Sequence, residues 1–361
     1  MSDRFCGRLA SLEAQLDKTL HGLPGVDPQR VQPSSISATS TLEGTRHSSL
    51  YLADGNLVVA AEGGAGKVLF RVHQSMLALQ SPVFASMFTL PAGAVKRDMY
   101  DGAPYVLMQD DAKDIESLLK VLYNPSELPY KRLDPLTPIN VRRTLAMATK
   151  YEMEPLRERI VAQLEADWPT SVAEWDRLGT EVRALRWEHS TSGGYTVDDL
   201  YLDDRLPEPG AAIRLAMDFN IPKILPAAFY HLSRLSIDAD WLEFRKNRER
   251  LGLERTARWD LLEAGDFKLL LKLREVITDF DWTNTTSKSC NTPDDCDDWW
   301  NLTSLRWNNA EDILDCMRQF VETRPARGLC KPCWIASKDA IQQGRLNFWD
   351  EICDCIEERM K

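Results

Sequence analysis

Short apolar runs separated by glycine-rich turns dominate the chain just after residue 50 and predict a small sheet. Leu57–Ala61 and Val68–Val72 are two such runs, joined by a segment that includes Gly63 and Gly66. This arrangement predicts a β-hairpin. Tyr105–Met108 is predicted to be a further strand, because it is again a short run rich in aromatic and β-branched residues.

Helical periodicity follows the hairpin and continues after the last of these strands. In the helix predicted from residue 110, the apolar positions at helical spacing are Ile115, Leu118, Leu119 and Leu122, which share one face. Ser81 precedes Pro82 and is predicted to cap the second helix. The predicted helices are Gln74–Leu79, Pro82–Thr89, Asp110–Tyr123, Val141–Tyr151 and Glu154–Trp168.

Two further regions flank this mixed segment. Residues 1–47 place leucines at helical spacing near the start and then become rich in Ser, Thr, Gly and Pro, so we expect a flexible tail with a short N-terminal helix. Residues 169–361 are mostly helical in pattern. The sequence therefore predicts an α+β fold, with a sheet-containing domain over residues 48–168 and a mainly α-helical C-terminal region with a cysteine cluster over 169–361.

Two local patterns stand out in the helical region. Ile213–Leu225 resembles Leu145–Leu156 at an offset of 68 residues, with Phe219 in the place of Tyr151, which suggests two similar helical hairpins. A loop around residue 200 carries Asp198, Asp199, Asp203 and Asp204. The loop lacks the glycine and the closing glutamate of a calcium-binding EF-hand, so we expect these carboxylates to be solvent-exposed.

One stretch resembles a known family. Phe70-Arg71-Val72-His73-Gln74-Ser75-Met76-Leu77, followed by Ser81-Pro82-Val83-Phe84 and Met87-Phe88, resembles the core signature of BTB/POZ domains. The order of the predicted elements agrees, and the resemblance covers residues 48 to 168. Met99-Tyr100-Asp101-Gly102 and Asp110-Asp111-Ala112-Lys113-Asp114 look similar to a large group of BTB proteins from basidiomycete fungi, in which a helical region follows the BTB domain.

The resemblance implies a protein-interaction module that recruits partners and often forms homodimers. Some BTB proteins are adaptors for a cullin-type ubiquitin ligase, which they bind through an apolar residue, any residue and a glutamate on the helix predicted here over Asp110–Tyr123. Alignment on Tyr123 places Ile115 at the apolar position, Glu116 in the middle and Ser117 where glutamate is expected. We therefore rank the adaptor role below a general interaction role, with Ile115, Glu116 and Ser117 as the candidate partner-binding residues.

Seven of the eight cysteines lie between residues 290 and 355. Cys290, Cys296, Cys330 and Cys333 form two pairs that could supply four thiolates to one structural zinc ion. The alternative is that these cysteines are ordinary buried residues without metal. In the fungal group, a similar C-x-x-C is followed by a helix with an Arg and a Trp, matched here by Arg345 and Trp349.

Composition restricts the remaining possibilities. The net charge of -11 argues against binding to nucleic acid or to anionic membranes. No apolar run is long enough to span a membrane, and the N-terminus lacks the pattern of a signal peptide, so we expect an intracellular protein of the cytoplasm or nucleus. None of the five histidines lies in a catalytic motif, and we expect His73 to have a structural role and His231 to be a packed or rim residue. A metal-dependent or redox enzyme is the third and least favoured possibility, so the protein is predicted not to be an enzyme.

Overall fold

The computed structural model describes most of the chain from residue 43 onward. The described ranges are residues 43–89, 98–129, 131–193, 195–246, 252–280, 296, 310–323 and 329–360. The predicted N-terminal helix and Cys290 lie outside them. Residues 43–168 are called the sheet region below, and residues 169–360 the helical region. No helix within the described ranges is both long enough and apolar enough to cross a membrane.

The sheet region contains a five-stranded sheet with the order β1-β3-β2-β5-β4. The antiparallel β2–β3 hairpin confirms the predicted one, and β2 runs parallel to β5 on its other side. All five residues of Leu57–Ala61 are buried, as expected for a strand at the centre of the sheet. The strands are β1 Thr45–Tyr51, β2 Leu57–Gly63, β3 Gly66–Val72, β4 Met99–Tyr100 and β5 Ala103–Asp111.

The turn between β4 and β5 explains the Asp-Gly pair noted in the sequence. Asp101 and Gly102 both have positive φ, at 50° and 75°, as the two central residues of a tight hairpin turn require. The Asp101 carboxylate then accepts a hydrogen bond of 3.0 Å from the hydroxyl of Tyr51. This pair links the turn to β1 at the opposite edge of the sheet.

The helices of the sheet region confirm those predicted. Ser81 caps α3 as expected, because its Oγ accepts the N–H of Phe84 at 3.1 Å, and it also donates to the carbonyl of Tyr151 at 2.5 Å. His73 has the structural role predicted for it, with its N–H donating to the Tyr123 hydroxyl at 2.8 Å. The helices are α2 Gln74–Gln80, α3 Pro82–Thr89, α4 Ala112–Tyr123, η2 Pro125–Glu127, α5 Thr137–Lys150 and α6 Glu154–Asp167.

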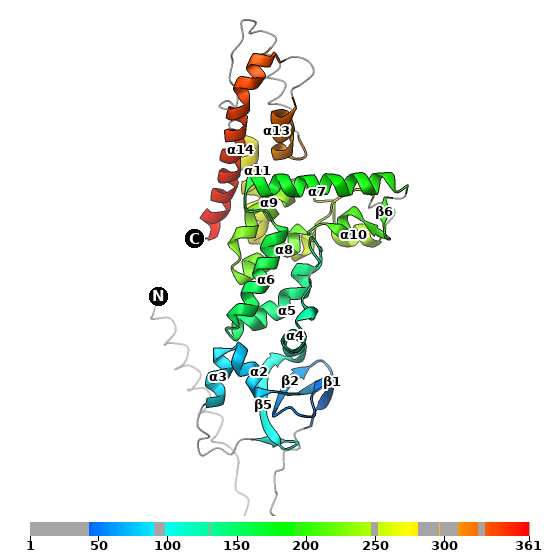
Figure 1. Cartoon of the computed structure of the whole chain (residues 1–361), viewed down its shortest axis with the longest axis vertical. Helices are drawn as coiled ribbons and strands as arrows, with labels where there is room; N and C mark the ends of the chain where they lie inside the picture. The colour runs from blue at the N-terminus through cyan, green and yellow to red at the C-terminus, as the bar shows by residue number, and fades with distance from the viewer. Residues whose placement is uncertain are drawn as a thin grey trace, which may run out of the picture. The chain divides into compact units, whose positions relative to one another are not determined.

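The helical region continues directly from α6 (Figure 1). Its first helix, α7, spans twenty residues, and its last, α14, spans thirty. Between them the only strands in the described residues are the short pair β6 Thr196–Val197 and β7 Leu200–Tyr201. The helices are α7 Val172–Thr191, η3 Leu202–Arg205, α8 Pro209–Phe219, η4 Pro222–Ile224, α9 Leu225–Ser233, α10 Trp241–Lys246, η6 Trp259–Leu261, α11 Ala264–Asp279, α13 Ile313–Glu322 and α14 Lys331–Met360.

The sequence echo at an offset of 68 residues corresponds to matching backbone geometry. Glu152 after α5 and Asn220 after α8 both adopt the left-handed conformation, with φ of 51° and 52°. The following residues then donate backwards in the same way, from Met153 to Ala148 at 2.8 Å and from Ile221 to Ala216 at 2.9 Å. Both helices therefore end in the same C-terminal turn, and the two hairpins pack together through α5 and α8.

The predicted exposure of the acidic loop is wrong for Asp203. This residue lies in η3 with only 1% of its surface exposed. Its carboxylate binds Arg255 at 3.0 Å and the Thr256 hydroxyl at 2.5 Å. The pattern alone could not show this, because the partners of Asp203 lie about fifty residues further along the chain.

One hydrophobic core extends through both regions. It includes Leu50 and Phe70 from the sheet, Leu145 from α5, Phe229 from α9 and Ile356 from α14. The join between the regions is itself part of this core, since Trp168 is 2% exposed. The two regions are therefore connected by packed side chains as well as by the chain.

Candidate functional site

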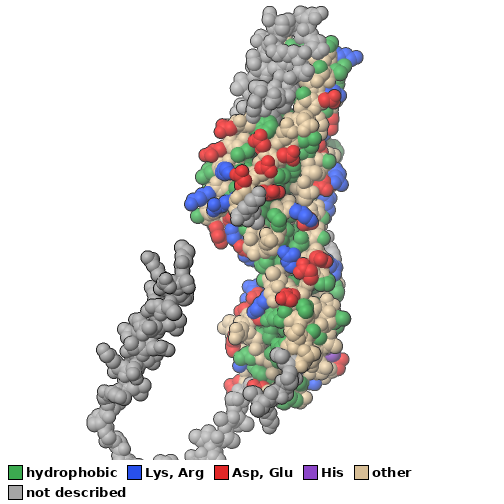
Figure 2. Space-filling view, turned by 90° about the vertical axis from the view of Figure 1, so that its left-hand side faces the viewer, with side chains coloured by type: hydrophobic (Ala, Val, Ile, Leu, Met, Phe, Trp, Pro, Cys, Tyr) green, Lys and Arg blue, Asp and Glu red, His purple; other side chains and the backbone are tan. Residues whose placement is uncertain are grey.

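The α2–α3 hairpin carries an apolar and uncharged surface. Residues 74–89, which include both helices, contain no charged side chain. Leu79 is 78% exposed, whereas Val83, Met87 and Phe88 are partly exposed and rest against the core. Figure 2 shows hydrophobic side chains gathered on the face over these helices. Exposed apolar surface without charge is typical of the centre of a protein interface.

The three candidate residues on α4 take part in contacts within the fold. Ile115 is 3% exposed and belongs to the core. The Oγ of Ser117 lies 2.8 Å from the Oγ1 of Thr144 on α5. The Glu116 carboxylate lies 2.7 Å from Lys120 and 3.4 Å from the His47 ring, and the hydrogen bond from Lys120 is the main cause that lowers its pKa. Glu116 and Ser117 are both partly exposed, whereas Ile115 is buried.

Three of the four cysteines chosen from the sequence meet in the structure. The thiols of Cys296, Cys330 and Cys333 lie within 4.8 Å of one another. Cys296 and Cys333 are buried, and Cys330 is partly exposed. Such a cluster could bind a metal ion.

Helix α14, which carries Cys333 and begins directly after Cys330, is bound to its neighbours by the Arg and the Trp noted in the sequence. Arg345 is 1% exposed and donates through Nε to the carbonyl of Leu314 on α13 at 3.1 Å. Its Nη2 also binds the Asp176 carboxylate on α7. Trp349 packs against Trp175 of α7 with ring centroids 6.0 Å apart. These two residues therefore hold α7, α13 and α14 together.

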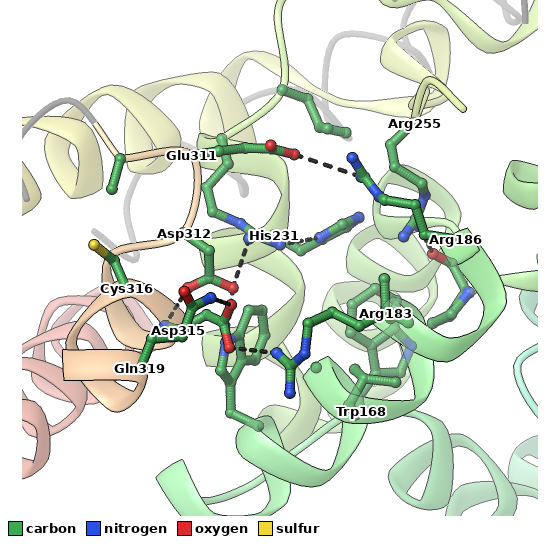
Figure 3. Close-up of a pocket in the computed structure, with 18 residues that line it drawn as sticks. Trp168, Arg183, Arg186, His231, Arg255, Glu311, Asp312, Asp315, Cys316 and Gln319 are labelled. Atoms are coloured by element: carbon green, nitrogen blue, oxygen red, sulfur yellow. Dashed lines mark hydrogen bonds and ion pairs between the residues drawn. The ribbon is translucent and has the colours of Figure 1, made fainter. Parts of the chain in front are cut away.

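A pocket of about 370 Å³ opens between α7, α9 and α13. Figure 3 shows carboxylates of the segment around residue 312 on one side of His231 and arginine side chains on the other. Apolar side chains, among them Trp168, Leu178 and Leu235, also line the pocket. Each of the four lining arginines has an acidic partner: Arg183 with Asp315, Arg186 with Glu311 at 3.7 Å, Arg234 with Asp312 at 2.8 Å and Arg255 with Asp203 at 3.0 Å.

Asp312 lines the pocket and makes hydrogen bonds to three of its elements. It caps α13 by accepting the N–H of Asp315 at 3.1 Å. Its carboxylate also accepts from the Trp175 indole and from the Tyr230 hydroxyl, each at 3.1 Å. A single carboxylate thus joins α7, α9 and α13. Burial raises the pKa of Tyr230 well above its usual value, so the hydroxyl keeps the proton that it donates to Asp312.

His231 forms part of the pocket wall as a neutral side chain. Its Nδ1 accepts from Arg234 at 2.7 Å, which places the ring proton on Nε2. Burial, with the charges of Arg255 and Arg234, lowers the pKa of His231 well below its usual value, so the ring is neutral. Within the described part of the chain, Nε2 is buried without a hydrogen-bond partner. The neutral imidazole is therefore packed into the wall of the pocket, and this nitrogen is closed to solvent.

No sequence motif marks this pocket. The packed position expected for His231 is confirmed, since only 8% of the residue is exposed. The other lining groups come from α7, α9, the segment near residue 255 and α13, which no sequence motif connects. The arginines on α7 could have pointed to a charged site, but several arginines are ordinary on a solvent-exposed helix and do not predict a pocket.

Comparison with known protein families identifies the sheet region. Residues 52–167 match the BTB/POZ domain family. No curated protein matches the chain. The matched segment runs from the residue after β1 to the end of α6, so it includes β2 to β5, the α2–α3 hairpin and α4. The chain therefore contains a BTB/POZ domain, a protein–protein interaction module, followed by a mostly helical region.

Proposed function

We propose that the chain is a non-enzymatic interaction protein that self-associates through its BTB domain and recruits a partner through its helical region. The observation that supports self-association is the uncharged α2–α3 surface, on which Leu79 is largely exposed. BTB domains mediate protein–protein interactions, dimerisation among them. A second copy of the chain would cover the same apolar surface symmetrically.

The variant Leu79→Glu tests this proposal, because it introduces charge into the proposed interface without touching the core. Leu271→Glu is the matched control, since Leu271 is a leucine on α11 that is 58% exposed. Light scattering after gel filtration should give a dimer for the wild type and for Leu271→Glu, and a monomer for Leu79→Glu. Equal masses for the two variants would contradict the role of the α2–α3 surface.

The partner site of the helical region is proposed to be the pocket at His231. Arg186 fits a carboxylate from a partner side chain, because its bond to the largely exposed Glu311 is long, at 3.7 Å. The interaction would combine one charged contact with the apolar walls, as small binding pockets usually do.

Gly179 on α7 offers a way to block the pocket without removing a charge. Its side-chain position faces the pocket, since an added Cβ would lie 3.4 Å from the Arg183 guanidinium and 3.9 Å from Asp315. Gly179→Leu should fill the space, whereas Gly179→Ala adds only a methyl group. Proteins that co-purify with the wild type should be lost with the Leu variant and kept with the Ala variant. The same set with all three proteins would contradict the proposed site.

An adaptor role for a cullin-type ligase is the alternative. It depends on the α4 residues, of which Ile115 and Ser117 already contact the fold. Cullin binding by the wild type would favour the adaptor role. Cullin binding that appears or strengthens with Ser117→Glu would show that this face of α4 is the cullin-binding surface. Absence of binding in both would leave self-association and partner recruitment as the proposed function.

A further inference from the structure

The cysteine cluster is separate from the interaction surfaces and has a chemistry of its own. Cys296, Cys330 and Cys333 bring three sulfur atoms within 4.8 Å of one another. Sulfur ligands at about 2.3 Å from a tetrahedral zinc ion lie about 3.8 Å apart. The spacing of the three thiols therefore allows one ion to contact all of them after small side-chain rotations.

The backbone at the start of α14 holds the Cys330 sulfur in place. Cys330 comes directly before α14, and its Sγ accepts the backbone N–H of Cys333 at 3.4 Å. The Cys330 sulfur therefore lies at the N-terminal end of a long helix. The same turn brings the Cys333 thiol beside that of Cys330.

The other described cysteines lack this setting. Cys353 and Cys355 lie near the opposite end of α14, where burial raises the pKa of both thiols, that of Cys353 to about 11. Cys316 lies on α13 and lines the pocket at His231. The cluster is thus confined to the cysteines at the start of α14 and the single residue Cys296.

We propose that Cys296, Cys330 and Cys333 bind one structural zinc ion, with a fourth ligand completing the tetrahedron. Each thiol that binds loses its proton to solvent as its sulfur–zinc bond forms, so binding involves no oxidation. The ion links residue 296 to the start of α14. Further along this helix, Trp334 donates to the Phe320 carbonyl at 3.0 Å, and Arg345 binds α13 and α7. The metal would therefore stabilise the arrangement of helices that forms the pocket.

Metal content of the purified full chain tests the proposal. We expect one zinc per chain in the wild type and close to none in the double variant Cys330→Ser with Cys333→Ser. Cys353→Ser is the control, because Cys353 is a partly exposed cysteine on α14 outside the cluster, and this variant should keep its zinc. A chelator should lower the Tm of the wild type by at least about 5 °C and leave that of the double variant unchanged.

A second measurement keeps the test valid if the double variant fails to fold. Cadmium added to the metal-free wild type should produce sulfur-to-metal charge-transfer absorption with the intensity of at least three thiolates. A wild type that contains no zinc and shows no such absorption would overturn the proposal. Zinc retained in full by the double variant, or a disulfide between two of the three cysteines in the purified wild type, would also overturn it.

Discussion

The BTB domain and the helical region differ in what they bury. Among the described residues, the buried polar groups of the BTB domain are the uncharged Ser81, Thr137 and Thr144, with Asp167 at its very end. The helical region buries charged residues: Asp203, Glu208, Arg255, Asp266 and Arg345. The BTB domain is thus defined mainly by apolar packing, whereas the helical region depends on polar contacts between distant segments.

This difference has an energetic meaning. Apolar packing contributes stability roughly in proportion to the buried area. A buried ion pair contributes little net stability but is costly to break, because one charge is then left without its partner. Substitutions of single polar residues should therefore affect the helical region more than the BTB domain.

Arg345→Leu should produce the largest effect on this comparison. The change removes the contacts to the Leu314 carbonyl and to Asp176 while keeping an apolar side chain in the core. We expect the free energy of unfolding to fall by about 2–4 kcal/mol, measured by urea denaturation followed through tryptophan fluorescence.

Lys272→Met is the control for this loss of a positive charge. Lys272 binds Glu358 of α14 at 2.9 Å, but both side chains are more than half exposed. Exposed pairs of this kind contribute little stability, because water and dissolved ions screen the attraction. If Arg345→Leu and Lys272→Met lower the free energy of unfolding by similar amounts, buried charged residues do not set the stability of the helical region apart from that of the BTB domain.

Asp167→Asn should have a smaller effect and the opposite sign. Burial raises the pKa of Asp167 from 3.8 to about 6, so the folded state holds this proton more tightly than the unfolded state. Its contribution to stability is therefore present below pH 3.8, declines as the pH rises to about 6, and is a penalty at pH 7. Asparagine can still accept the Leu133 N–H, which lies 2.9 Å from Asp167 Oδ1. The variant should be more stable than the wild type at pH 7 by about 1–3 kcal/mol.

Urea denaturation at pH 4 and at pH 7 measures this effect. The difference between Asp167→Asn and the wild type should widen as the pH rises. A difference that is constant with pH, or an asparagine variant that is less stable at pH 7, would contradict this prediction. It would show that hydrogen bonds and charges in the fold offset the cost of burying the Asp167 carboxylate, as they do for the buried carboxylates of the helical region.

The same comparison explains how much the sequence could predict. The β2–β3 hairpin, the helices α2 to α6 and the Ser81 cap follow from local periodicity and from residues close in the chain. The contacts of Asp312 do not, because Trp175 lies 137 residues before it. Nothing in the local pattern distinguishes this aspartate from an exposed N-cap residue.

The cysteines are an intermediate case. Thiols are rare, and their grouping in the sequence was enough to select Cys296, Cys330 and Cys333 before the structure brought them together. For Asp203 the same kind of inference was wrong, because acidic residues are common and most are exposed. Sequence prediction of a site is therefore better for a rare side chain than for a common one.

Sedimentation equilibrium of the full wild-type chain tests the central claim, self-association through the BTB domain, most directly. We expect the apparent mass to rise with concentration from the monomer value of 41.1 kDa to twice that value. A mass that stays at the monomer value up to tens of micromolar, on the order of the affinities of weak dimers, would contradict it.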